Sequence, residues 1–193
     1  MTLEYAILGF LEREPMSGYD LKTRCFDATV GHIWTADQAQ VYRTLERLAK
    51  RGLARSRLVP QRGRPDRRVF SITPGGSGAL ASWLREAQDP APLRDPLLLR
   101  LSLADALPDG EVLDVLAQAR RGYQTRLETL RAQVSAPTPA CAATDERGRE
   151  LYRMTLRAAM SQTRTAIDWI DDCTDRITGG LPSAAAANTK QGV

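Results

Sequence analysis

Apolar residues recur at helical spacing between residues 35 and 53. Val41, Leu45 and Leu48 fall at i, i+4 and i+7, which predicts a helix with one buried face. The opposite face collects amide and cationic side chains, at Gln40, Arg43, Arg47 and Lys50. Thr35 and Gln38 predict a capping box at the start of this helix, and Gly52 is placed where a helix often ends. The pattern predicts a helix held by a core on one side and suited to a DNA groove on the other, although an ordinary solvated helix would show the same pattern.

Two more helices are predicted before this one. An apolar face from Leu3 to Leu11 predicts the first, which Pro15 ends. Ser17 is the expected cap of the second, with Gly18 and Tyr19 in its first turn, where free backbone amides could meet a phosphate. An ordinary helix start is an equally good reading of those residues. Trp34 is expected to fill the core just before the third helix.

The pattern changes from helical to extended after Gly52. Residues 53–59 and 68–73 are short apolar-containing runs around a loop rich in glycine and proline, which predicts a β-hairpin. The loop carries three arginines suited to phosphates or to a narrow minor groove, namely Arg62, Arg64 and Arg67. Thr73 and Pro74 then predict the start of a fourth helix.

Three helices, a hairpin and a fourth helix, in this order, define a winged helix-turn-helix. We therefore expect a mainly α chain, with an α+β winged helix-turn-helix domain at 1–89. A helical domain is expected at 94–178 and a disordered tail at 179–193, which is small and polar.

The second half of the chain predicts helices that one small lobe cannot bury. Residues 97–107 are apolar nearly all round and are expected to be buried between other elements. Asp109 and Thr144 are the expected starts of two long helices, each with an apolar stripe. A homodimer in which these stripes pack together is the simplest way to bury them.

Charge supports a polyanion as partner. The chain carries a net charge of +4, yet residues 43–68 hold ten cations against Glu46 and Asp66, a local charge of +8, and the remainder sums to −4. Localised positive charge on an otherwise acidic protein is typical of nucleic-acid binding.

Other chemistries find little support in the sequence. The single histidine, His32, argues against a histidine metal site or a hydrolytic triad, and no phosphate-binding glycine loop is found. The sequence indicates no enzyme, cofactor, metal or membrane segment, and three widely spaced cysteines indicate a cytoplasmic protein without a disulfide framework. Cys25 or Cys173 could be a redox switch, although an inert buried thiol is the simpler interpretation.

The N-terminal motifs resemble those of the PadR family of transcriptional regulators. The resemblance rests on residues 6–11 and 15–22, on 38–48 followed by Gly52 and Leu53, and on 63–68 with 71–75. In the C-terminal half it rests mostly on patterning, together with residues 94–100.

This resemblance implies a dimeric regulator, usually a repressor, that binds a palindromic operator and responds to a small molecule. Gln40 and Arg43 are the expected base readers, because Gln pairs with adenine and Arg with guanine. The expected phosphate contacts are Arg47, Lys50, Arg62, Arg64 and Arg67. Gln38 and Tyr42 also match the family's DNA-facing segment, with the alternative for Tyr42 that its ring packs in the core and only its hydroxyl reaches phosphate. Trp83, Tyr152 and Trp169 are candidates for an effector pocket, with ordinary packing as the alternative. The rival function is a winged-helix protein-interaction module without sequence-specific DNA binding.

Overall fold

The computed structural model describes residues 2–60, 66–89 and 94–180. These residues form two compact units, one made of 1–90 with 136–157 and the other of 91–135 with 158–193. The predicted domain limits differ from this division, because residues 136–157 pack with the N-terminal unit. The arginines Arg62 and Arg64 and the tail beyond residue 180 lie outside the described residues.

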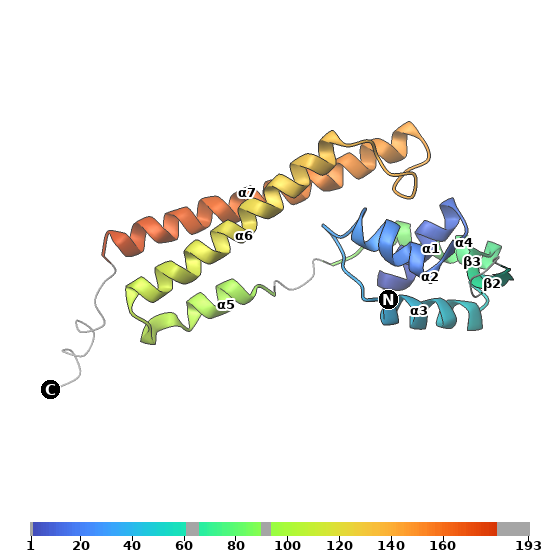
Figure 1. The fold of residues 1–193 in the computed structure, drawn as a ribbon, viewed down its shortest axis with the longest axis horizontal. Helices are drawn as coiled ribbons and strands as arrows, with labels where there is room; N and C mark the ends of the chain where they lie inside the picture. Colours follow the sequence, from blue (N-terminus) through green and yellow to red (C-terminus); the bar gives the residue numbers. More distant parts are fainter. Residues whose placement is uncertain (1, 61–65, 90–93, 181–193) are drawn as a thin grey trace. The chain divides into compact units, whose positions relative to one another are not determined.

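The N-terminal unit has the element order expected for a winged helix (Figure 1). Its helices and strands are α1 (Thr2–Arg13), β1 (Met16–Ser17), α2 (Gly18–Asp20), the π-helix η1 (Leu21–Asp27), α3 (Gln38–Lys50), β2 (Ala54–Val59), β3 (Arg67–Ile72) and α4 (Pro74–Arg85). Ile7, Leu21, Val41 and Leu45 are fully buried in one core. The winged helix-turn-helix expectation is confirmed.

The sheet contains a strand that the sequence did not predict. Strand β3 pairs antiparallel with β2 along its whole length and with β1 on its other side, where Met16 faces Phe70. Two residues are too few to produce a strand pattern in the sequence. Their pairing joins the start of α2 to the wing, which is the β2–β3 hairpin.

Trp34 does not fill the core as expected, since its side chain is 42% exposed. The core position before α3 is taken instead by Ala36, which is buried. The second helix also differs from an ordinary helix, because after α2 it continues as the π-helix η1.

A set of backbone contacts joins α3, the wing and α4. Gly52 has a φ of 70°, and the amides of Gly52 and Leu53 donate to the carbonyls of Ala49 and Leu48, a Schellman ending. The Leu53 carbonyl accepts from the Thr73 amide at 3.1 Å, and the Thr73 hydroxyl donates to the Gly52 carbonyl at 2.7 Å. Thr73 also caps α4 by accepting from the Gly76 amide, as predicted.

The second unit contains α5 (Pro96–Ser102), the 3-10 turn η2 (Ala104–Ala106), α6 (Asp109–Ser135) and the later part of α7 (Glu146–Thr178). Leu116 and Ile170 are fully buried in its core. The expected start of α6 at Asp109 is correct. Helix α7 begins two residues after Thr144, and the Asp145 carboxylate accepts from the Gly148 amide at 2.6 Å in place of a threonine cap.

The expectation that residues 97–107 are buried is wrong within a single chain. Leu99, Leu103 and Leu107 are 62%, 68% and 44% exposed. Only one side of this segment packs on the second unit's core, through Leu97 and Leu101. The other side is an apolar surface that faces solvent.

The backbone contacts that join α3, the wing and α4 form a junction at Leu53, and they predict different effects for two nearby glycines of α4. A Cβ at Gly76 would lie 2.1 Å from the Leu53 carbonyl oxygen, whereas a Cβ at Gly78 would meet nothing within 4 Å. We expect Gly76→Ala to lower the free energy of unfolding by about 1–3 kcal/mol, because the backbone must move apart. Gly78→Ala, the matched control, should raise it by up to about 1 kcal/mol through helix propensity. Urea denaturation followed by circular dichroism measures both, and equal effects would contradict the close approach.

Candidate DNA-binding surface

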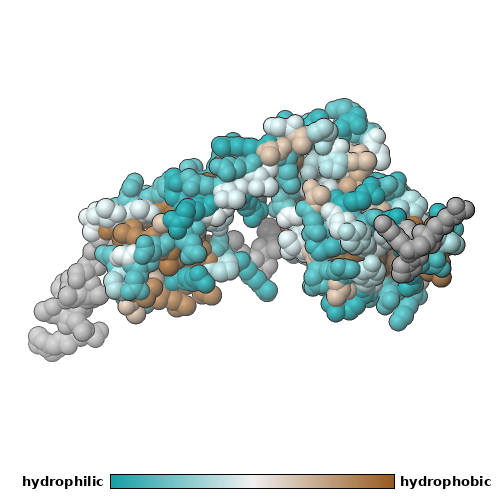
Figure 2. Space-filling model, in the orientation of Figure 1, coloured by the Kyte–Doolittle hydropathy of each residue, from teal (hydrophilic) through white to brown (hydrophobic). Residues whose placement is uncertain are grey.

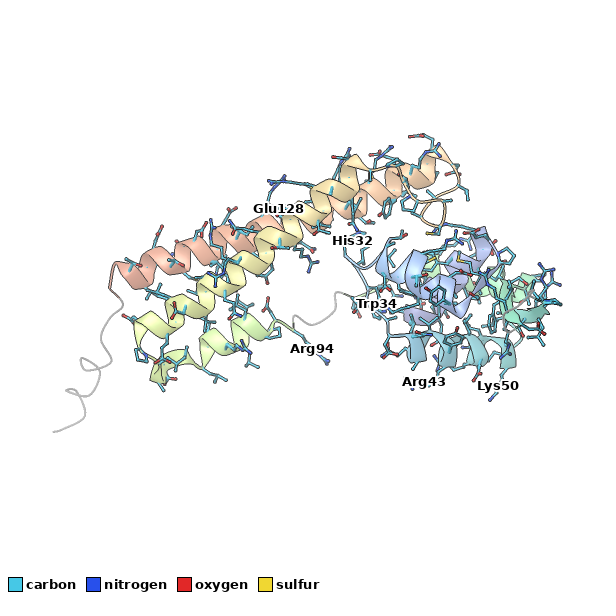
Figure 3. The ribbon with its side chains drawn as sticks, viewed as in Figure 1. His32, Trp34, Arg43, Lys50, Arg94 and Glu128 are labelled. Carbon is cyan, nitrogen blue, oxygen red and sulfur yellow. The ribbon has the colours of Figure 1, made fainter. Side chains whose placement is uncertain are left out.

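The outer face of α3 carries the predicted polar set. Val41, Leu45 and Leu48 are fully buried, so the helix is held by the core along one stripe. The six predicted DNA-contacting residues of this helix are all exposed: Gln38, Gln40, Tyr42, Arg43, Arg47 and Lys50. Figure 3 shows Arg43 and Lys50 along the outer edge of α3, pointing away from the body of the unit. This face is free to enter a groove.

The start of α3 lies later than predicted and changes the role of Gln40. Asp37, not Thr35, is the N-cap, and its carboxylate accepts from the Gln40 amide at 2.7 Å. The Gln40 side-chain oxygen in turn accepts from the Asp37 amide at 3.2 Å, which completes a capping box. The expected box of Thr35 and Gln38 is therefore wrong. Gln40 keeps its amide NH₂ group as a donor, while its oxygen is engaged in the cap.

Tyr42 packs its ring against the start of α2. A Cβ added at Gly18 would lie 2.6 Å from Cε1 of Tyr42, so only a glycine leaves room for this ring. Tyr42 remains 38% exposed. The side chain therefore joins the two helices of the helix-turn-helix, in addition to its predicted place on the DNA-facing side.

Arg47 is held by a buried carboxylate on α1. Its Nε donates to Glu4 Oε1 at 2.5 Å, and Arg51 Nη1 donates to the other Glu4 oxygen at 3.0 Å. Glu4 is only 8% exposed. Burial acts to raise the pKa of Glu4, but hydrogen bonds and charge from Arg47 and Arg51 outweigh it and hold that pKa below its ordinary value. Sequence reasoning missed Glu4 because its partners lie 43 and 47 residues away.

The start of α2 is engaged internally. The Ser17 amide and hydroxyl both donate to the Asp20 carboxylate, at 3.0 and 2.7 Å, and the Ser17 hydroxyl accepts from the Asp20 amide. The predicted Ser17 cap is confirmed. Ser17 and Gly18 are buried, whereas Tyr19 is 61% exposed. Of the three predicted phosphate-contacting residues, Tyr19 alone presents a free side-chain surface.

The wing supplies further positive charge. Arg55, Arg57, Arg67 and Arg68 are exposed on β2 and β3. Arg67 donates to the Asp20 carboxylate, so this predicted phosphate contact is linked to α2. The Arg68 guanidinium lies 4.9 Å above the Phe70 ring.

The three candidate effector residues lie in different surroundings. Trp83 stacks on Tyr5 at 4.9 Å and lines an apolar groove of about 440 Å³ in the N-terminal unit. Trp169 lines a cavity of about 470 Å³ in the second unit, together with Tyr123 and Asp95. Tyr152 is buried, and its hydroxyl donates to the backbone carbonyl of Thr29 at 3.2 Å.

The described ranges show neither a metal centre nor a membrane span. No group of histidine, cysteine and carboxylate side chains there could hold a metal ion. None of the helices in those ranges is both long enough and apolar enough to cross a membrane.

Taken together, an exposed polar face on α3 and an arginine-bearing wing define a winged helix-turn-helix of the kind that regulators of transcription use. Residues 7–82 match the Transcriptional regulator PadR-like family, and residues 93–178 match the Virulence activator alpha C-term family. The probable transcriptional regulator Rv1176c of Mycobacterium tuberculosis is 30% identical over 92% of this chain and 98% of its own length. This chain belongs to the PadR-like family of transcriptional regulators.

Similarity to a second regulator extends to solved structures. The negative transcriptional regulator PadR of Bacillus subtilis is 25% identical over 88% of this chain and 94% of its own length. Its crystal structure in complex with operator DNA has a TM-score of 0.77 at 24% identity, covering 92% of this chain and 99% of that chain. Its complex with p-coumaric acid has a TM-score of 0.70 at 23% identity, covering 91% and 95%. Both relatives are named as regulators of transcription rather than as enzymes.

The Glu4 contacts predict a pH-dependent contribution to stability. Glu4→Gln keeps the shape of the side chain but removes its charge, and should lower the free energy of unfolding by about 1 kcal/mol at neutral pH. Because the folded-state pKa of Glu4 is depressed, the stabilisation is present above its unfolded pKa of about 4.3 and is lost as the pH falls through the folded value. The difference between wild type and variant, measured by urea denaturation, should therefore shrink below about pH 4.

Glu46→Gln is the control, because Glu46 is an exposed α3 carboxylate that lies 3.8 Å from the guanidinium of Arg68. It should change stability by less than about 0.5 kcal/mol. A Glu4→Gln effect that stays constant down to acidic pH would show that the charge is not responsible.

Proposed function

We propose that this protein is a homodimeric, sequence-specific DNA-binding repressor that acts in the cytoplasm and is released from its operator by a small molecule. The observation that carries the proposal is the exposed face of α3, whose polar residues point outward from a fully buried stripe. In each protomer α3 lies in a major groove, with the two half-sites one helical turn, about 34 Å, apart.

Roles within the surface follow from the reach of each side chain and from the hydrogen bonds it makes within the protein. Arg43 is exposed and early in the helix, so it reads a guanine edge. Gln38 and the free NH₂ of Gln40 lie beside it at the helix start. Lys50, Arg47 and the wing arginines bind phosphate, and Arg62 and Arg64 join them in this proposal on the strength of their sequence position alone.

The homodimer is supported by the uncovered apolar side of α5 and η2. Figure 2 shows hydrophobic surface over this part of the second unit. Leu99, Leu103 and Leu107 stand there beside half-buried leucines of the same helix. A contiguous apolar surface of this kind is typical of a protein interface, and a second copy of the chain covers it in our proposal.

Release by a small molecule is supported by a relative and by available space. The PadR of Bacillus subtilis has been crystallised with p-coumaric acid. In the present chain, the groove beside Trp83 and the cavity beside Trp169 each have the volume and apolar lining of a small-molecule site. Tyr152 is a less suitable lining residue, because its hydroxyl is already bonded to the backbone.

Two substitutions on α3 separate base reading from phosphate binding. Arg43→Ala should weaken operator binding by about 1–3 kcal/mol and relax the preference at one base pair. Lys50→Ala should weaken binding to all duplexes and reduce the slope of log K against log salt by about 0.9. Arg131→Ala, which removes the same charge from exposed α6 surface, is the control and should change neither quantity. Fluorescence anisotropy with the DNA upstream of its own gene and a scrambled duplex provides the measurement.

Equal affinity for the two duplexes would exclude sequence-specific binding. If neither α3 variant altered DNA affinity, the protein-interaction module would be the better description of this winged helix.

The dimer proposal is tested on the exposed leucines of the segment 97–107, which contains α5 and η2. Leu99→Glu with Leu103→Glu should shift the sedimentation coefficient from dimer to monomer, because two charges would otherwise be buried in the interface. Leu58→Glu is matched in exposure, at 67% against 62% and 68%, but lies on the wing. It should leave the dimer intact. A double variant that sediments as wild type would place the interface elsewhere.

A further inference from the structure

Two cysteines that are far apart in sequence lie together in the N-terminal unit. Cys25 belongs to η1 and Cys141 to the segment between α6 and α7, and both are free thiols. Their exposed fractions are 0% and 2%. The Cys141 thiol contacts the chain on both sides of Cys25, at the Arg24 carbonyl and at the Thr29 hydroxyl, and the Thr29 amide donates to the Cys25 carbonyl. Each thiol also shifts the pKa of the other, so the two side chains interact.

The surroundings of Cys141 suit a thiolate. Its Sγ lies 3.1 Å from the Thr29 hydroxyl and donates to the Arg24 carbonyl at 3.3 Å. The Thr29 hydroxyl is itself a donor, at 2.7 Å, to that same carbonyl. Once Cys141 loses its proton, rotation of this hydroxyl lets it donate to the sulfur instead, so the site can satisfy either protonation state.

Electrostatics divides the two thiols into unequal partners. Interaction with Cys25, the Thr29 hydroxyl and the charge of Arg24 together lower the pKa of Cys141 against the effect of burial. Interaction with Cys141 and burial raise the pKa of Cys25. Cys141 has a hydroxyl within hydrogen-bond distance of its sulfur, whereas the Cys25 thiol donates to the sulfur of Met16. Cys141 is therefore the thiolate that attacks, and Cys25 retains its proton until an electrophilic sulfur is beside it.

We propose that Cys25 and Cys141 form a peroxide-sensitive dithiol site that closes to an intramolecular disulfide. The Cys141 thiolate attacks hydrogen peroxide: an S–O bond forms, the O–O bond breaks, and the released hydroxide takes up a proton to become water. Cys25 then attacks the resulting sulfenic acid sulfur, so that an S–S bond forms and the S–O bond breaks. The hydroxide that leaves combines with the Cys25 proton as a second water. The two thiols supply the two electrons that reduce the peroxide.

Burial determines which oxidants the site accepts. Cys141 lies in a segment without helix or strand, held by a hydrogen bond from Arg13 to its carbonyl at 2.5 Å and by the contact of its sulfur with Arg24. Local opening of such a segment admits a molecule of the size of peroxide while the native unit excludes a bulky aromatic disulfide reagent. The disulfide would then join residues on η1, which precedes α3, to the segment before α7.

Peptide mapping of the full-length wild-type protein tests the proposal. Reduced protein is treated with hydrogen peroxide, denatured in N-ethylmaleimide and digested with trypsin without reductant. We expect a mass loss of about 2 Da, corresponding to two hydrogens, and a linked pair of the peptides 25–43 and 132–147. Peptide 165–176, which contains Cys173, should carry maleimide.

Variants test the assigned roles. Cys173→Ser should oxidise as wild type. Cys25→Ala should accumulate a sulfenic acid at Cys141 that dimedone traps, because the second thiol is missing. Cys141→Ala should slow the peroxide-dependent loss of the Cys25 thiol more than about tenfold, because the thiolate is the nucleophile.

Several results would overturn the proposal. These are a wild-type digest in which both peptides still carry maleimide, a cross-link between two chains, a bridge to Cys173, or oxidation confined to Met16, whose sulfur lies 3.6 Å from that of Cys25. The mapping uses wild-type protein alone, so its outcome stands even if a cysteine variant fails to fold.

Discussion

The peptide of Leu53 fixes α3, the wing and α4 to one another. Its amide ends α3, its carbonyl accepts from Thr73, and Gly76 passes so close to that carbonyl that no side chain fits between them. A winged helix binds one duplex with both its helix and its hairpin only if the two keep a constant separation. Backbone contacts maintain that separation better than flexible arginine side chains can, so the DNA-facing surface depends on this junction.

Local signals in the sequence were sufficient for most of the fold. The buried stripe of α3, the Ser17 and Thr73 caps and the Gly52 ending all depend on residues within a few positions of one another, and the structure agrees with each. Errors arose where two local solutions competed. Sequence alone offers Asp37 with Gln40 as well as Thr35 with Gln38 as the helix start, and the structure uses Asp37, directly after the buried Ala36.

Contacts between distant parts of the chain were beyond sequence reasoning. The exposed polar face of α3 was predictable from periodicity, but its engagement by Glu4 from α1 was not. The same holds for Asp20 with Arg67 and for Cys25 with Cys141, because no periodic pattern relates residues so far apart. The prediction that the apolar segment 97–107 is buried failed for a different reason. An apolar surface indicates that something packs against it, but its hydrophobicity does not tell whether that partner is the same chain.

The place of Glu4 makes α1 part of the electrostatics of the basic surface. Arg47 and Arg51 share the two oxygens of its one carboxylate. One negative charge therefore offsets part of the positive charge of two guanidinium groups on and beside α3. A helix from an earlier part of the chain thus tempers the attraction of this surface for any polyanion, a long-range property that does not depend on base sequence.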